Sequence, residues 1–167
     1  MSLFHVLQRI LYKHIHVIDM IVGSGEEAIF SGEIPVNTVM AWAYKDNVPD
    51  MVLRDGFISD LKKNGWDDKC NEKIREIVES NDLYLSTCFI FHIGSGRYID
   101  LNNIVKFHID AIFHAACPDI KKAQNRHDWK VNKIIAQKYM SEKNKNNEMM
   151  ELKISVSDDT LIDCRKS

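Results

Sequence analysis

Five polar residues in one short stretch have the types and spacing that metal-assisted phosphate chemistry needs. Asp100 and Asn102 are two positions apart, which in an extended segment points both side chains the same way. Asn103, Lys106 and Asp110 follow at i, i+3 and i+7, so they share one face of a helix. Mg²⁺ prefers oxygen ligands, and a lysine one helical turn away can hold a phosphate. The stretch is therefore a candidate divalent-metal site.

The same residue types also suit a purely structural role. Asp and Asn are favoured N-cap residues, because their side chains accept hydrogen bonds from the first free N–H groups of a helix. A metal site would need a further carboxylate, and Asp128, just before a predicted strand, is the candidate. The residues alone leave the capping interpretation and the metal interpretation open.

Hydrophobic periodicity predicts the elements that must position this stretch. Residues 83–93 alternate in polarity and predict a core strand whose odd-numbered side chains share the buried face. A helix beginning near Asn102 follows, with Val105 and Ile109 facing the sheet, and Pro118 stops it. The other predicted elements are a short helix over 3–15, a strand over 26–35, a partial helix over 50–64 ended by Gly65, a helix over 66–80 capped by Asp67, and strands over 129–140 and 149–156.

This order of elements predicts an α+β fold with a single mixed or antiparallel sheet and helices packed on it. The last two strands are predicted to pair as a hairpin with a long loop. Residues 1–25 predict an N-terminal helical extension, residues 26–157 the main domain, and residues 158–167 a polar tail. The extension is a candidate for docking on the domain or on a protein partner.

Composition indicates an ordinary soluble domain, with 167 residues, 45% hydrophobic and 28% charged. The apolar-rich N-terminal stretch is interrupted by charged and histidine residues, so neither a membrane span nor a secretory signal is expected. The four cysteines lie far apart without a CxxC pair, which favours reduced thiols and a cytoplasmic protein.

The charge is unevenly distributed although the net charge is only −2. Residues 97–145 contain ten Lys or Arg and five Asp or Glu, a balance of +5, which leaves −7 for the remainder. A locally basic half can steer a protein toward phosphates, although a solvated lysine-rich face would show the same composition.

The candidate stretch resembles the motif of the RusA family of Holliday junction resolvases, which are small, homodimeric, Mg²⁺-dependent endonucleases of phages, prophages and bacteria. The family pattern is Asp-x-Asp-Asn-x-x-Lys-x-x-x-Asp-Ala, and this chain has DLNNIVKFHIDA over residues 100–111. The downstream aspartate pair of the family corresponds to His127 and Asp128, before a similar strand. Upstream, residues 30–45 are similar to the opening strand and its proline-asparagine loop, and the resemblance covers about residues 28–157.

The resemblance implies a RusA-like domain and a role for each matching residue. Asp100, Asn102 and Asp128 would bind Mg²⁺, which Mn²⁺ could replace, and Lys106 would assist cleavage together with Asp100 and Asp128. Arg97, Asn103, Lys106 and Lys130 are the candidate DNA contacts. The chain departs from the pattern at Asn102, where the family has aspartate, and this change removes a negative charge and should weaken Mg²⁺ binding.

Two functions from different classes follow from the resemblance. The first is a structure-selective endonuclease of DNA recombination and repair, in a bacterium or an infected cell, that hydrolyses phosphodiesters at four-way DNA junctions and acts as a homodimer. The second is a RusA-like protein that has lost cleavage through Asn102 and binds DNA or a protein partner as a regulator or assembly component.

Two further patterns are weaker. His108, His114, Cys117 and His127 include zinc-ligand types, but their spacings match no tight zinc pattern, and core or helix-surface positions explain them better. Trp42 and Tyr44, beside Lys45, have the composition of a base-stacking surface, although aromatic residues more often fill a core or a dimer interface.

Overall fold

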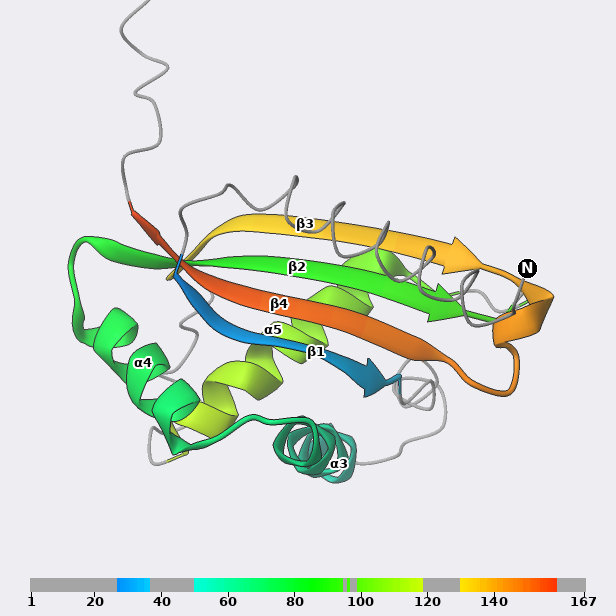
Figure 1. Ribbon diagram of the computed structural model, residues 1–167, viewed down its shortest axis with the longest axis horizontal. Coiled ribbons are helices and arrows are strands. Elements are labelled where there is room, and N and C mark those ends of the chain that lie inside the picture. Colours follow the sequence, from blue (N-terminus) through cyan, green and yellow to red (C-terminus); the bar gives the residue numbers. More distant parts are fainter. Residues whose placement is uncertain (1–26, 37–49, 95, 97–98, 119–129, 159–167) are drawn as a thin grey trace, which may run out of the picture.

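The computed structural model describes residues 27–36, 50–94, 96, 99–118 and 130–158. These residues form an α+β fold with a four-stranded mixed sheet and three helices, as predicted (Figure 1). The predicted N-terminal extension and the tail after Asp158 lie outside the described residues, as do Trp42, Tyr44 and Lys45.

The sheet has the strand order β1-β4-β2-β3. Its strands are β1 (Ala28–Pro35), β2 (Leu83–Ile93), β3 (Val131–Met140) and β4 (Met149–Asp158). β4 pairs antiparallel with both β1 and β2, whereas β2 and β3 run parallel. β2 is therefore an inner strand, and eight of its eleven residues are buried.

The predicted hairpin of the last two strands is wrong, because β2 lies between β3 and β4. The connection from β3 crosses the end of β2 instead of turning back on itself. Ser141 N donates to Ile93 O at 2.9 Å, and Asn144 Nδ2 donates to the same oxygen at 3.4 Å. The sequence predicted both strands but could not show which strands each would pair with.

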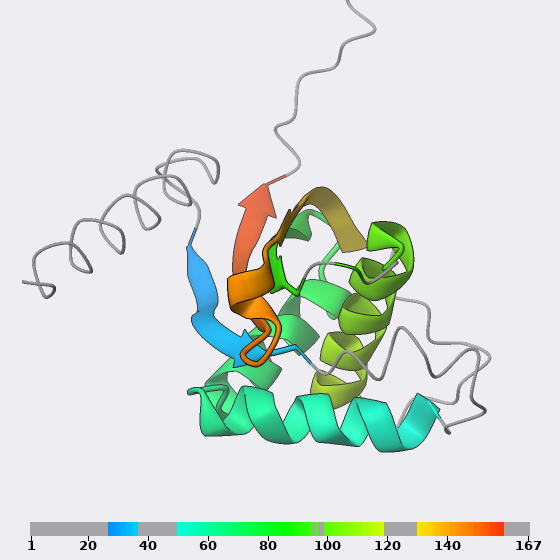
Figure 2. The same cartoon turned by 90° about the vertical axis from the view of Figure 1, so that its right-hand side faces the viewer.

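All three helices cover one face of the sheet (Figure 2). They are α3 (Asp50–Lys63), α4 (Asp68–Glu79) and α5 (Leu101–Ala116), close to the predicted ranges. Gly65, at φ +100°, follows α3 as the predicted stop. α5 contacts α3, α4 and the sheet together, so its buried surface is much broader than the single stripe that the sequence suggested.

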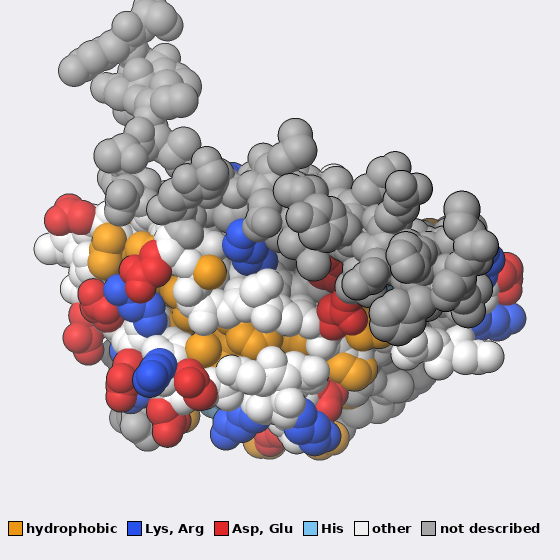
Figure 3. Space-filling view, viewed as in Figure 1, with side chains coloured by type: hydrophobic (Ala, Val, Ile, Leu, Met, Phe, Trp, Pro, Cys, Tyr) orange, Lys and Arg blue, Asp and Glu red, His pale blue; other side chains and the backbone are white. Residues whose placement is uncertain are grey.

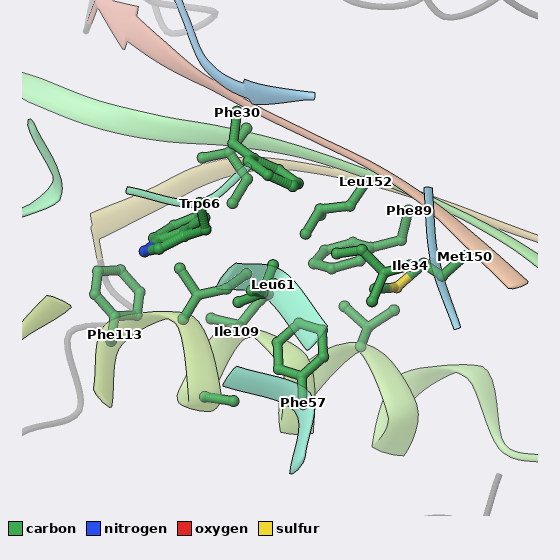
Figure 4. Close-up of a cluster of buried hydrophobic side chains, with 14 of the residues drawn as sticks. Phe30, Ile34, Phe57, Leu61, Trp66, Phe89, Ile109, Phe113, Met150 and Leu152 are labelled. Atoms are coloured by element: carbon green, nitrogen blue, oxygen red, sulfur yellow. The ribbon is translucent and has the colours of Figure 1, made fainter. Parts of the chain in front are cut away.

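The main core lies between these helices and the sheet (Figure 4). Phe89 and Phe91, two odd-numbered residues of β2, are fully buried there, and their rings lie parallel with centroids 6.0 Å apart. Phe57 and Leu61 of α3 and Ile109 of α5 close the core from the helical side. This packing fixes where α5 begins, and hence where the candidate site lies.

Candidate functional site

Asp100 is the N-cap of α5 and directly precedes the helix. Its backbone is extended, at φ −72° and ψ 117°, and its Oδ1 accepts a hydrogen bond from Asn102 N at 2.9 Å. Its carbonyl oxygen accepts the first helical bond, from Ile104 N, at 3.2 Å. The capping role predicted for this turn is confirmed, and capping occupies only part of the carboxylate's capacity to accept hydrogen bonds or a cation.

The residue before the cap is held by a lysine from the edge of the sheet. Lys138, near the end of β3, donates from Nζ to Ile99 O at 2.8 Å. This contact ties the turn before Asp100 to β3, 39 positions away in the sequence. Nothing in the sequence around Lys138 indicated this contact, because its partner is distant in the chain.

The end of β2, from which the chain passes to α5, is held by the β3–β4 connection. Gly94 N donates to Glu148 Oε1 at 2.9 Å. A Cβ at Gly94 would lie 2.9 Å from the Cα of Lys145, so only glycine fits this close approach. The connection therefore helps to fix the point where the chain leaves the sheet toward Asp100.

The side chains predicted to act at the start of α5 are accessible. Asp100, Asn102, Asn103 and Lys106 are all exposed, and the helix brings Lys106 one turn from Asn102 and Asn103. Asp110 is exposed one further turn along. Arg97 lies outside the described residues. The helix N-terminus adds a partial positive charge that favours anions such as phosphate near this end.

One predicted DNA contact, Lys130, directly precedes β3, at the end of the strand opposite to Lys138. Lys130 is fully buried, and its Nζ donates to Ser80 O and to Leu83 O, the latter at 3.3 Å, at the beginning of β2. The ammonium also lies 5.1 Å from the centroid of the Tyr84 ring. A buried ammonium bonded to backbone carbonyls stabilises this end of the sheet, and we do not retain Lys130 as a DNA contact.

Asp128 lies outside the described residues, and Lys130 is the nearest described position to it. From Val131 to Lys138, the strand spans about 23 Å at the ordinary rise of a β-strand. Lys138 adjoins the turn before Asp100, whereas Lys130 adjoins the beginning of β2. Asp100, Asn102 and Lys106 thus lie at the cap and in the first two turns of α5, and the extended geometry predicted for Asp100 and Asn102 is wrong at Asn102, because the helix already begins at Leu101. The described part of β3 supplies no third metal ligand.

Asp100 and Asn102 offer oxygen ligands of the type that Mg²⁺ binds, but they offer few of them. One carboxylate and one amide oxygen match the ligands that Mg²⁺ takes, and Mg²⁺ usually keeps several waters. In the described ranges, no group of three or more His, Cys, Asp or Glu side chains could hold a metal ion. A Mg²⁺ bound by Asp100 and Asn102 would therefore need substrate phosphate or a further carboxylate as well.

The histidine and cysteine that zinc would use are packed into the interior. His108 is fully buried, its Nδ1 donates to Ile104 O at 2.6 Å, and its ring meets the Phe57 ring edge-on with centroids 4.6 Å apart. Burial lowers the pKa of His108 to about 4. Burial likewise raises the pKa of the Cys117 thiol. Of the other two candidates, His114 is half-buried on the same helix, and His127 lies outside the described residues.

No protein-family model matches this chain, and no curated protein matches it either. The resemblance to the resolvases therefore depends on the motif and on the order of elements around it. Of the helices in the described ranges, none is both long enough and apolar enough to cross a membrane.

Proposed function

We propose that this protein is a RusA-like, divalent-metal-dependent endonuclease that acts on four-way DNA junctions. The observation that carries the proposal is the start of α5, where Asp100, Asn102 and Lys106 are exposed at the cap and within the first two helical turns. A carboxylate, an amide oxygen and a lysine on a helix N-terminus combine two cation ligands with two features that attract phosphate.

Each residue has a distinct task in this proposal. Asp100 and Asn102 hold Mg²⁺, and substrate phosphate and water fill its other coordination positions, because Lys130, the described position nearest to Asp128, lies at the other end of β3. The metal supplies an activated water and charge stabilisation when bound. Lys106 binds the phosphate and offsets the charge that develops on its oxygens during hydrolysis. Lys138 holds the carbonyl before Asp100 and so keeps the cap in place.

Asn102 makes this a weak site. An amide oxygen can coordinate a cation but contributes no negative charge, and ligand charge is one of the main determinants of divalent-cation affinity. We therefore expect slow cleavage that needs high Mg²⁺, with Mn²⁺ supporting a faster reaction.

The test is cleavage of a synthetic four-way junction at several Mg²⁺ and Mn²⁺ concentrations, with linear duplex of the same sequence as the substrate control. Asn102→Asp should raise cleavage about tenfold or more, because it restores the missing charge. Lys106→Ala should lower it in that background. Asn71→Asp, a change of the same chemical kind on another helix, should have no effect, and cleavage unaffected by Asn102→Asp or Lys106→Ala would overturn the proposal.

A second candidate function is junction binding without cleavage. It is favoured by Asn102 itself and by the capping bond, because together they leave Asp100 as the only charged ligand in the described part of the site. Junction binding with no nicking by the natural chain, and nicking by the Asn102→Asp variant, would identify a protein that has kept the fold and lost the chemistry.

A further inference from the structure

One face of the sheet is not covered by any helix of the described ranges. α3, α4 and α5 all pack on the opposite face (Figure 2). Because side chains alternate along a strand, the residues of β2 and β4 that do not point into the main core point to this open face. They are Tyr84, Ser86, Cys88, Ile90, His92, Glu151, Lys153, Ser155 and Ser157. Water normally reaches the uncovered face of an antiparallel sheet, so these residues are expected to be exposed.

The centre of the open face is buried instead. Cys88 and Ile90 are each only 2% exposed, and together with Ile135 of β3 they form an apolar cluster separate from the main core. Ser86 and Ser155, which lie opposite each other on β2 and β4, are 2% and 0% exposed. Neighbours in a sheet stand beside a side chain and leave its outer end open. Burial this complete therefore indicates a layer above the open face, although no described helix forms one.

The chain before β1 is placed to supply that layer. Val156 N donates to Glu27 O at 2.8 Å, and Ala28 pairs with Ser155, so the chain enters β1 level with the two buried serines. Residues 1–26 precede this point and lie outside the described residues. Residues 16–26 can span at most about 36 Å. Crossing the sheet from β1 to β3 takes only three strand spacings, about 14 Å, so the segment before them can reach any part of the open face.

The beginning of the sequence has an apolar surface of matching size. The helix predicted over residues 3–15 has an apolar stripe at helical spacing, made of Leu3, Val6, Leu7, Ile10 and Leu11. Such a helix would be about 20 Å long. From Ser86 to His92, the open face also measures about 20 Å along β2. The stripe is therefore long enough to cover the whole buried centre of the face.

We propose that residues 3–15 dock as an amphipathic helix on the open face, with their apolar stripe over Cys88, Ile90 and Ile135. The sheet is then enclosed from both sides, which accounts for the burial of its centre. A segment tethered to β1 has an effective concentration in the millimolar range, so it occupies the face ahead of a second copy or another protein. The N-terminal extension is thereby assigned to the domain of its own chain.

The docked helix would also support the candidate site. β2 is the strand from which the chain passes to α5, and its helical face is already packed against the main core. Packing on both faces holds the end of β2, and with it the turn before Asp100, more firmly than packing on one face. The inference needs neither metal nor DNA, so its tests are separate from those of the proposed function.

The first test is methyl NMR spectroscopy of the natural full chain, isotope-labelled at the methyl groups of isoleucine, leucine and valine. Nuclear Overhauser effects should join the Ile90 methyls to methyls of Leu7 or Ile10, and the variants Ile90→Val and Ile10→Val assign these signals. A mixture of labelled and unlabelled chains separates contacts within one chain from contacts between two. Contacts between chains would identify a second copy as the occupant, and the absence of any contact would leave the face to a different partner. Either result would overturn the proposal.

The second test is the reactivity of Cys88 toward a thiol reagent, followed at each cysteine by mass spectrometry. Burial raises the pKa of the Cys88 thiol, so a docked helix keeps this thiol protonated as well as covered. Ile10→Asp, which places a charge in the stripe, should speed the labelling of Cys88 about tenfold or more. Cys70, in the main core, should keep its slow rate.

Gln8→Asp adds the same charge outside the stripe, so it is the matched control and should label like the natural chain. If Ile10→Asp unfolds, Cys70 will also label fast, and the NMR contacts of the natural chain then decide. Equal labelling rates of Cys88 in a folded Ile10→Asp variant and in the natural chain would show that residues 3–15 do not form the cover.

Discussion

Two helices of this protein begin in nearly the same way and have very different surroundings. α4 is capped by Asp67, whose carboxylate accepts a hydrogen bond from Cys70 N at 3.0 Å. α5 is capped by Asp100, which accepts from Asn102 N at 2.9 Å. An aspartate before a helix is therefore not in itself a sign of function, because the same chain uses the same device twice.

The difference lies in what surrounds each cap. Around α4, opposite charges are paired: Lys73 Nζ lies 3.1 Å from Glu76 and 3.5 Å from Glu27, and acidic and basic side chains interleave at this end of the molecule (Figure 3). At the start of α5, a carboxylate, two amides and a lysine are exposed together. The start of α4 therefore serves as a control for the start of α5, because it has the same cap without the cluster of exposed polar side chains.

The largest expected effect is on the pH dependence of stability, and it comes from His108, because α5 buries a titratable ring and α4 buries none. The pKa of His108 is lowered to about 4 by burial, so the unfolded chain takes up its proton first as pH falls. The free energy of unfolding should therefore fall as the pH is lowered from about 6.5 to 4, by about 3 kcal/mol in total. Above pH 6.5 the ring is neutral in both the folded and the unfolded chain, and this contribution no longer changes. Urea unfolding across this pH range measures the loss.

Matched variants isolate this contribution from other titrating groups. His108→Phe should flatten the pH dependence between 6.5 and 4, whatever its effect on absolute stability. Ile112→Val, a buried change without a titratable group on the same helix, should keep the pH dependence of the natural chain. An equal slope in the natural chain and in His108→Phe would show that the buried ring does not cause the loss.

The second prediction removes a cap's charge while keeping its hydrogen bond. Asn is as good an N-cap as Asp, so Asp100→Asn and Asp67→Asn should both retain helix stability. Asp100→Asn should weaken Mn²⁺ binding about tenfold or more, because it removes a charged ligand, whereas Asp67→Asn should not change it. Titration calorimetry with MnCl₂ measures both. Equal affinities for the two variants would reduce Asp100 to a cap.

Some features of these helices and of the sheet could be predicted from the sequence, and others could not. Period-2 alternation predicted β2 and β4, and cap residues predicted the starts of α4 and α5, because these signals are local. The partners of β3 and β4 were not predictable, because the bonds from Ser141 and Asn144 that carry their connection across Ile93 join distant positions. The burial of Lys130 was equally hidden, since a lysine before a strand is usually exposed.

The third prediction removes the hydrogen bond as well as the charge. Asp100→Ala and Asp67→Ala should each lower the free energy of unfolding by about 1 kcal/mol, the usual cost of losing an N-cap side chain. Urea unfolding at neutral pH measures both changes. Similar losses would confirm that the two caps are structurally equivalent, so that any functional difference between them must come from their surroundings. A much larger loss at Asp100 would mean that the turn held by Lys138 is a structural centre in its own right.

The smallest effect on stability is expected from the lysine of each helix, where DNA binding separates them. Lys106→Ala and Lys73→Ala are expected to change the free energy of unfolding by no more than about 0.5 kcal/mol, because both changes are at the surface and exposed ion pairs contribute little.

If Lys106 contacts a phosphate, its loss should reduce the slope of log affinity against log salt by about one for junction DNA. Lys73, whose charge is already paired with two glutamates, should leave that slope unchanged. Fluorescence anisotropy with a labelled junction, titrated at several salt concentrations, measures both slopes. Equal slopes would mean that α5 meets DNA no more closely than α4 does.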